Sequence, residues 1–265
     1  MKISIIGAGI KGLEQITIEA LQKIITSEKV LTFCTIPPEF AFQHKIDLSK
    51  VEYIGDLYHD QAIDEDNYMR IVSKIKLESQ NNSNVAVIVA GHPRIGVTFV
   101  QWMDRESNKY EFRTIPGVSS FDTMLNDLKR DPIERGTQIL EANRILLFKQ
   151  DINPTLDTYI YHVCSIGNRR TDYVDPVSHN QAVLLRNHLL KHFHPQHDVI
   201  LIESANGSNQ ETSKHNGTVE SLVDLLSSVT YSSTLFIPAA VPKTYDRNFL
   251  EFLKSDSRNG IEATL

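Results

Sequence analysis

The chain has 265 residues, 41% of them hydrophobic, and a formal net charge of -6 at pH 7. A chain of this length can bury roughly three quarters of the surface that it exposes when unfolded, so we expect one large or two modest domains without disulfide bonds. The acidic, mixed charge argues against a nucleic-acid partner, which would require a basic stripe. No run approaches about 18 apolar residues and no signal peptide is visible, so we expect a cytoplasmic protein with no membrane partner.

The first half of the chain alternates strand and helix patterns. Val85–Ala90 is the clearest strand, a continuous apolar run of the kind found in parallel sheets that are buried on both faces. The predicted strands are Ile3–Ile6, Val30–Thr35, Val51–Ile54, Val85–Ala90 and Glu111–Thr114. Helices are predicted over Gly12–Thr26 and Glu65–Ser79, and a third one ends near Met103.

The pattern changes after Pro116-Gly117. Helices are predicted over Ser119–Leu128 and Asn180–Phe193, and the polar residues 207–217 are predicted to form a loop. The predicted strands are Gln138–Leu140, Ile145–Phe148, Thr158–Val163, Val199–Ile202 and Leu235–Pro238. The whole is an α/β chain whose second half has the larger antiparallel share. We therefore expect an N-terminal domain at 1–114, a C-terminal domain at 118–245 and a tail at 246–265.

The cysteines and histidines carry little functional signal. Cys34 and Cys164 lie in apolar segments, which favours buried, reduced thiols. Four histidines crowd residues 188–197, but no cysteine or histidine cluster has the spacing of a zinc site. No metal centre is predicted.

The first strand runs directly into Gly7-Ala8-Gly9-Ile10-Lys11-Gly12, which fits the dinucleotide fingerprint G-x-G-x-x-G. Glycine permits positive φ and leaves room for a close backbone approach to a ligand. NAD binding also needs a carboxylate near the end of the second strand, and NADP binding needs an arginine. The second strand ends in Phe33–Pro38, which contains neither. The sequence therefore lacks the residue with which an NAD(P)-dependent oxidoreductase would hold the ribose of its cofactor.

Two later turns follow predicted strands in the same way. Gly91-His92-Pro93 follows the clearest strand, and Pro116-Gly117-Val118-Ser119-Ser120 leads from a strand into a helix. Ligands of open α/β sheets bind at the carboxyl ends of strands, so these turns are candidates for the walls of one site. Each turn alone is weak evidence, and their order along the chain is the informative feature.

That order resembles the tetrapyrrole methylase superfamily, the class III S-adenosylmethionine (SAM) methyltransferases. Within it the chain looks most like the borosins, which are peptide backbone α-N-methyltransferases, and especially the split type, whose precursor peptide is a separate chain. The residues that carry this likeness are His92 in Gly91-His92-Pro93 and the segments Gly136–Ala142, Glu203–Asn206 and Ser233–Pro238.

The resemblance implies two α/β domains with SAM, and S-adenosylhomocysteine as product, in the cleft between them. It also implies a homodimer and a precursor peptide that binds in trans. The residues that would contact SAM are Gly7, Gly9, Ile10, Gly91, His92, Pro93, Val97, Ser119, Ser120 and Thr234.

A peptide amide is a poor nucleophile, because resonance occupies its lone pair, so a base is needed. Tyr58 and Tyr68 match two tyrosines that the family uses, which implies Tyr58 as the base and Tyr68 as a positioning group. Arg70 could substitute for the family arginine, which is absent here, and His59 or His92 could accept the proton instead.

The tyrosine that precedes Gly-His-Pro in the family is also replaced, by Ala90. These departures leave two alternatives to peptide methylation. One is methylation of a tetrapyrrole or another small molecule, and the other is an inactive homologue that binds a peptide.

Overall fold

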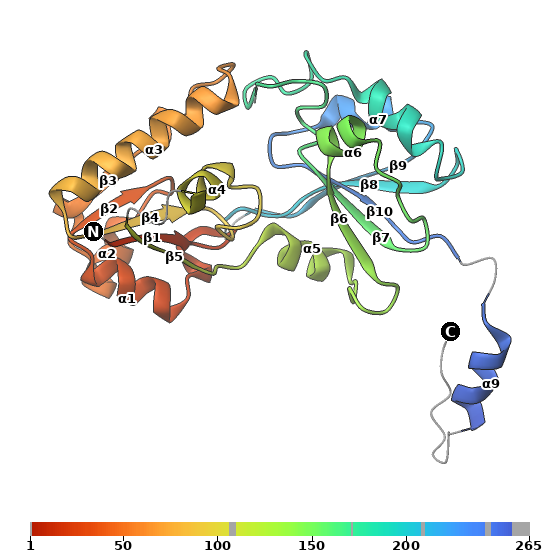
Figure 1. Ribbon diagram of the computed structural model, residues 1–265, viewed down its shortest axis with the longest axis horizontal. Coiled ribbons are helices and arrows are strands. Elements are labelled where there is room, and N and C mark those ends of the chain that lie inside the picture. Colours follow the sequence, from red (N-terminus) through yellow and green to blue (C-terminus); the bar gives the residue numbers. More distant parts are fainter. Residues whose placement is uncertain (1, 106–109, 171, 208–209, 242–244, 256–265) are drawn as a thin grey trace.

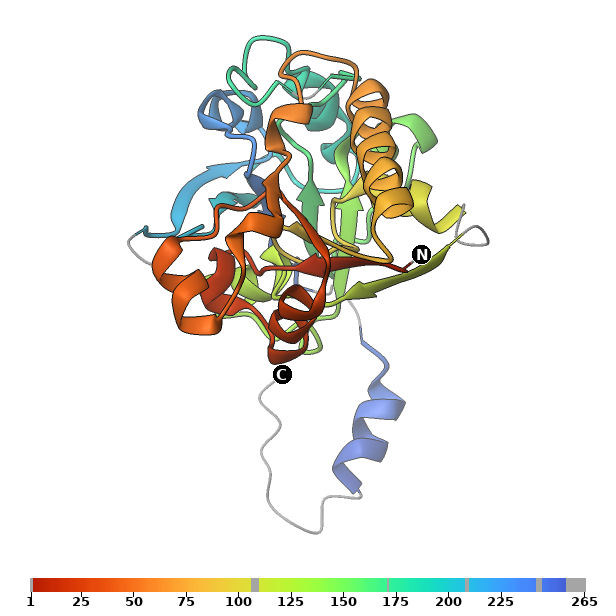
Figure 2. The same ribbon diagram turned by 90° about the vertical axis from the view of Figure 1, so that its left-hand side faces the viewer.

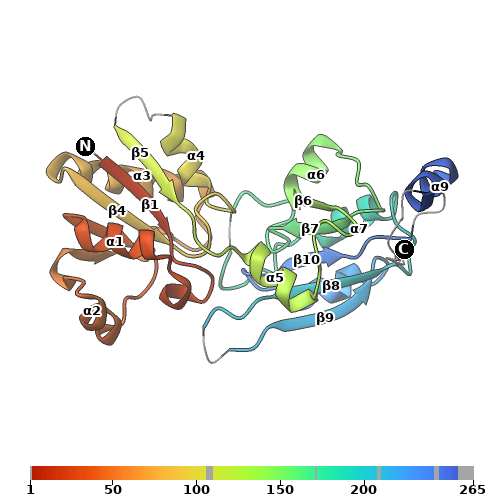
Figure 3. The same cartoon turned by 90° about the horizontal axis from the view of Figure 1, so that it is seen from below.

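The computed structural model describes residues 2–105, 110–170, 172–207, 210–241 and 245–255. Two five-stranded sheets lie side by side along the long axis of the molecule, one built from each half of the chain (Figure 1). The helix α5 (Ser120–Leu128) follows the last strand of the first sheet and lies at the junction between the two sheets (Figure 3).

The first sheet is parallel throughout and has the order β3-β2-β4-β1-β5. Its strands are β1 (Lys2–Gly7), β2 (Lys29–Thr32), β3 (Val51–Tyr53), β4 (Asn84–Val89) and β5 (Glu111–Ile115). Helices α3 (Asp64–Asn81) and α4 (Thr98–Arg105) pack on one face, and α1 (Ile18–Thr26) and α2 (Pro38–His44) pack on the other. Because β4 is central and covered on both sides, the structure confirms the prediction of a doubly buried parallel strand.

Three local predictions in this half need correction. The predicted helix Gly12–Thr26 is broken, because a short 3-10 turn ends at Gln15 and α1 starts only after Thr17, whose side chain accepts a hydrogen bond from the Ala20 amide. The strand predicted over Val30–Thr35 ends at Thr32. The Thr32 hydroxyl donates a hydrogen bond to the Cys34 carbonyl oxygen and accepts one from the Cys34 amide, so the backbone of Cys34 bonds locally and not to a neighbouring strand. Helix α2 was not predicted, since two prolines open it; Pro38 is tolerated at the first turn.

The second sheet has the order β6-β7-β10-β8-β9. Its strands are β6 (Thr137–Glu141), β7 (Asp157–Tyr161), β8 (Asp198–Glu203), β9 (Ser213–Thr218) and β10 (Thr234–Ile237). Only β6 and β7 pair in parallel among these strands, and the other three pairings are antiparallel, as predicted.

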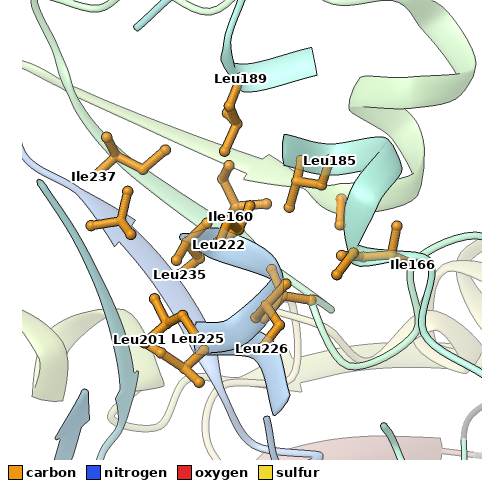
Figure 4. Packing of buried hydrophobic residues seen from close by; sticks show 14 of the residues in the cluster. Ile160, Ile166, Leu185, Leu189, Leu201, Leu222, Leu225, Leu226, Leu235 and Ile237 are labelled. Atoms are coloured by element: carbon orange, nitrogen blue, oxygen red, sulfur yellow. The ribbon is translucent and has the colours of Figure 1, made fainter. Parts of the chain in front are cut away.

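One face of this sheet packs against α6 (Ala142–Phe148), α7 (Ala182–Leu189) and α8 (Leu222–Leu225). Figure 4 shows this core, in which Ile160 and Leu235 of the strands meet Leu185, Leu189 and Leu222 of the helices. The other face packs against α5 through Met124. Both faces of the second sheet are therefore covered near its centre.

Three more predictions differ from the structure. Residues 145–148, predicted as a strand, belong to α6, because Glu141 caps that helix by accepting hydrogen bonds from two backbone amides. Residues 213–218, predicted as loop, form β9, a polar edge strand whose outer side meets solvent. The helix predicted over Asn180–Phe193 is limited to α7.

The tail forms one further helix, α9 (Arg247–Ser255), which projects away from both sheets (Figure 2). The remaining tail residues, 256–265, lie outside the described residues. None of the helices that the structure describes is long and apolar enough to cross a membrane.

Candidate active site

A cavity of about 1110 Å³ opens between the two halves of the chain. From the first half its wall is made by Tyr58, the start of α3 and the loop 94–98 that leads into α4. From the second half its wall is made by the ends of β6 and β7, by α6 and by residues 167–169. Both sets follow the carboxyl ends of parallel strands, where α/β folds bind their ligands.

The predicted glycine turns meet each other through their backbones. Gly9 and Gly91 exchange two backbone hydrogen bonds, of 2.9 and 3.3 Å. A Cβ added at Gly7 would lie 2.4 Å from the Gly91 carbonyl oxygen and 2.7 Å from the Gly117 amide nitrogen. Glycine was expected here to leave room for a ligand. At Gly7 and Gly117 the room is instead taken by neighbouring backbone, which draws the ends of β1, β4 and β5 together.

The predicted SAM contacts are divided among this glycine junction, the cavity wall and the two elements α5 and β10. Among the described residues, Val97 is the one predicted contact that lines the cavity itself. The Ser120 hydroxyl lies 3.1 Å from the hydroxyl of Tyr161, which does line the cavity. Ser119 caps α5 in a reciprocal arrangement with Asp122, so its side chain is engaged in the helix start.

Four other predicted contacts are more enclosed. His92 is half-buried and its Nδ1 accepts a hydrogen bond from the Arg94 amide, while Pro93 is buried beside it. Thr234 is buried at the start of β10, where it pairs with Ile202 of β8. Ile10 packs against Gly91, where an added Cβ would approach its Cδ1 to 2.9 Å. Their contacts with SAM stay predictions.

The two predicted tyrosines stand together on the cavity wall. The Tyr58 hydroxyl donates a hydrogen bond of 3.1 Å to Asp64, and its ring centroid is 6.4 Å from that of Tyr68. The Tyr68 ring also packs edge-on against Trp102 at 5.7 Å. Burial, and then the nearby charge of Asp64, raise the pKa of the Tyr68 phenol. Tyr68 therefore remains protonated at neutral pH and can act as a hydrogen-bond donor.

Arg70 lies behind this wall rather than in it. Its Nε donates to the Leu57 carbonyl oxygen at 3.1 Å, and its Nη2 donates to Asn67. Asn67 in turn exchanges two hydrogen bonds with the backbone of His59. This network braces the short segment that carries Tyr58, so the geometry of Arg70 favours positioning over contact with substrate.

Sequence reasoning missed several lining residues. The arginines on the wall are Arg94, which is ion-paired with Asp104, Arg169, which is ion-paired with Glu65, and the exposed Arg144. Tyr161, Glu141 and His162 line the wall at the ends of β6 and β7. Glu141 directly follows a predicted strand, which was the available signal for it. Tyr161 and His162 fall inside the strand predicted over Thr158–Val163, but in the structure that strand ends at Tyr161.

Residues 163–170 and 172–181 tie the second half to the start of α3 (Figure 1). The Asp64 amide donates to the Arg169 carbonyl oxygen at 3.1 Å, and the Tyr173 amide donates to the Asp60 carboxylate at 2.8 Å. Because these bonds lie beside Tyr58, they fix the distance between the two walls on that side of the cavity. Among the described residues, no group of three or more histidines, cysteines and acids could hold a metal ion.

Comparison with known proteins identifies this architecture. Residues 2–214 match the family of Tetrapyrrole (Corrin/Porphyrin) Methylases. The chain belongs to this family. The match confirms the resemblance drawn from the order of the three glycine turns.

Several relatives of this chain share one description. A protein of Cerrena unicolor, described as a methyltransferase/ribosomally synthesized type I borosin cyclic peptide precursor, is 25% identical over 256 residues, which is 95% of this chain and 62% of that protein. One of the same description from Serendipita vermifera is 28% identical over 248 residues, which is 89% of this chain and 58% of that protein. The chain thus spans about 60% of the length of these relatives.

Solved structures share the fold. The uroporphyrin-III-C-methyltransferase of Thermus thermophilus aligns with a TM-score of 0.58 at 18% identity, over 89% of this chain and 94% of that one. The methyltransferase CobJ aligns with a TM-score of 0.59 at 9% identity, over 92% and 96%. These matches confirm the predicted α/β fold class of the tetrapyrrole methylases.

Proposed function

We propose that this chain is a SAM-dependent methyltransferase that N-methylates backbone amides of a ribosomally made precursor peptide. The observation that carries the proposal is the match, along about nine tenths of the chain, to proteins whose descriptions join a methyltransferase to a borosin peptide precursor. We further propose that the peptide is a separate chain, that the protein works as a cytoplasmic homodimer, and that its domains are 1–114 and 118–245.

The cavity suits a cationic cofactor and a peptide. Asp64, Glu65 and Glu141 place carboxylates on its wall, and the buried Oε2 of Glu65 has no hydrogen-bond partner among the described residues. SAM carries a positive sulfonium and an ammonium group, both of which such carboxylates favour. The volume of about 1110 Å³ slightly exceeds that of a pocket for one drug-sized molecule, which leaves space beside the cofactor. When bound, SAM supplies an electrophilic methyl group.

The chain's own residues would then align the acceptor. Val97 and the backbone around Gly9 and Gly91 would hold the cofactor at the strand ends. Tyr68, kept protonated by burial, would donate a hydrogen bond to the amide oxygen, where negative charge develops as the nitrogen loses its proton. Holding donor and acceptor in line can contribute roughly 7–11 kcal/mol to lowering the barrier.

A tetrapyrrole is the second candidate, since the structural neighbours include a uroporphyrin methyltransferase. Tetrapyrroles of that kind carry several carboxylates, which favour a basic wall. Here three carboxylates balance three arginines, and Arg169 is ion-paired with the wall carboxylate Glu65, so the wall is not basic. The charge of the cavity therefore favours a peptide.

Two measurements test the proposal. Calorimetric titration with S-adenosylhomocysteine is expected to show binding, and titration with NADH is expected to show none. Incubation with SAM and the product of any short precursor gene adjacent to this one is expected to add one methylene mass per methyl group in tandem mass spectra, located on backbone nitrogens. Binding of NADH alone would overturn the proposal, as would cofactor binding with no mass change, which would favour a small-molecule substrate or an inactive homologue.

A further inference from the structure

Glu141 and His162 meet at the edge of the second sheet that faces the cavity. Strands β6 and β7 are parallel neighbours, and Glu141 is paired in register with Tyr161, the residue before His162. The carboxyl ends of parallel strands share one edge of a sheet, so the two side chains emerge together. The His162 Nδ1 lies 3.5 Å from the Glu141 Oε1, and both residues line the cavity.

The backbone of His162 is held in an uncommon conformation. Its φ is +57°, in the left-handed region, which residues other than glycine adopt at a cost of order 1–3 kcal/mol. This conformation ends β7, and the Ser165 amide donates to the His162 carbonyl oxygen at 3.1 Å. Such outliers cluster at functional sites, because the surrounding structure must compensate for the strain.

The imidazole bridges the two walls of the cavity. One nitrogen faces Glu141, and the other, Nε2, lies 3.6 Å from the point where a Cβ of Gly96 would stand, in the loop of the opposite half. The His162 side chain is 43% exposed and belongs to the lining of the cavity, so the ring meets the cavity space.

Glu141 is itself held in place. Its two carboxylate oxygens accept hydrogen bonds from the backbone amides of Asn143, at 3.2 Å, and Arg144, at 2.8 Å. Burial acts to raise the pKa of Glu141, but the hydrogen bonds from His162 and from these amides outweigh it, and the pKa is lowered. Glu141 therefore stays ionised at neutral pH and orients the imidazole through Nδ1–H, an arrangement that leaves Nε2 as an acceptor.

We propose that His162 is the proton acceptor of the methyl transfer and that Glu141 is its positioning residue. The proposal rests on the function proposed above. The proton on the acceptor nitrogen passes to the Nε2 of His162 as the new N–C bond forms. The S–C bond of SAM breaks and its electron pair stays on sulfur, so the products are the methylated amide, S-adenosylhomocysteine and an imidazolium that Glu141 stabilises and that then loses its proton to water.

The tyrosines fit other tasks. The Tyr58 hydroxyl donates a hydrogen bond to Asp64, and the raised pKa of Tyr68 keeps that phenol neutral. The charged groups that share the cavity with His162 come from α3, the loop before α4, β6, α6 and residues 167–169; they are Asp64, Glu65, Arg94, Glu141, Arg144 and Arg169.

The test compares single-turnover methylation by the full chain between about pH 5.5 and pH 9. His162→Gln is expected to lower the rate at least about 100-fold and to remove the rise in rate with pH. Glu141→Gln is expected to shift that rise to lower pH, because its neutral amide no longer stabilises imidazolium. Free imidazole is expected to restore part of the rate of His162→Ala.

His179→Gln is the matched control, since His179 also lies near a carboxylate, Asp172 at 3.8 Å, but is not among the residues that line this cavity. It should keep the wild-type rate and pH profile. The proposal is overturned if His162→Gln keeps the wild-type pH profile, or if imidazole restores no rate to a His162→Ala variant that still binds S-adenosylhomocysteine.

A second readout needs no methyl acceptor. Diethyl pyrocarbonate modifies accessible neutral imidazoles, and peptide mapping of the folded wild-type chain should find His162 modified. An unmodified His162 beside a modified His179 would overturn the geometry even where methylation occurs. Modification of His162 in a chain that methylates no peptide would instead count against the proposed function.

Discussion

Replacing Gly7 by alanine tests the backbone junction at the ends of β1, β4 and β5. The added Cβ would meet the Gly91 carbonyl oxygen at 2.4 Å and the Gly117 amide nitrogen at 2.7 Å. Overpacking an interior costs about 1–3 kcal/mol when side chains can adjust. Here the obstructing atoms belong to the backbone of two neighbouring strand ends, so we expect Gly7→Ala to lose about 3 kcal/mol of unfolding free energy.

Two other glycines separate crowding from backbone conformation. Gly12 has a φ of +69° but nothing within 4 Å of an added Cβ, so Gly12→Ala should cost only the conformational term, about 1–2 kcal/mol. Gly207 has open space and no left-handed φ, so Gly207→Ala should change the unfolding free energy by less than about 1 kcal/mol.

Thermal melts followed by circular dichroism measure the series. For a protein of this size about 1 kcal/mol corresponds to about 2–4 °C, so Gly7→Ala should melt about 6–12 °C below wild type. Binding of S-adenosylhomocysteine should weaken as well, because the ends of β1 and β4 move apart. If Gly7→Ala melts within about 2 °C of Gly207→Ala, the reasoning about close backbone contact is wrong.

Three further outcomes are expected. Tyr58→Phe removes the hydrogen bond to Asp64 and should slow methylation about tenfold without altering its pH profile; loss of the profile would return the base role to Tyr58. Burial acts to raise the pKa of Glu141, but hydrogen bonds outweigh it and the pKa is lowered, so ionised Glu141 stabilises the fold above the unfolded pKa of about 4.5. This stabilisation is lost as the pH falls through the folded pKa. In urea denaturation, Glu141→Gln should therefore lose less stability than wild type between about pH 5 and pH 3. Burial raises the pKa of the Cys34 and Cys164 thiols to about 11, so both should react with 5,5′-dithiobis(2-nitrobenzoic acid) at about pH 8 only on unfolding; rapid reaction of the folded chain would contradict this.

Strong local sequence patterns were sufficient to predict much of the fold. The apolar run at Val85–Ala90 predicted a central parallel strand, and hydrophobic spacing predicted α3 and α5 nearly to their ends. Weak patterns failed for a physical reason. The apolar segment 145–148 suits a helix or a strand equally, and the capping carboxylate of Glu141 decides for the helix. The edge strand β9 is polar, so no alternation marks it.

The order of three glycine turns in the sequence was enough to predict the family. It also predicted that the carboxyl edge of the first sheet forms one wall of the site. Only the tertiary structure decided what those glycines do, because their close contacts join residues 7, 91 and 117. It also decided which side chains face Tyr58 across the cavity. Glu141 and His162 meet through strand pairing, and Gly96 approaches His162 from the other half of the chain. Contacts between residues so far apart arise from the packing of whole elements, which no local pattern encodes.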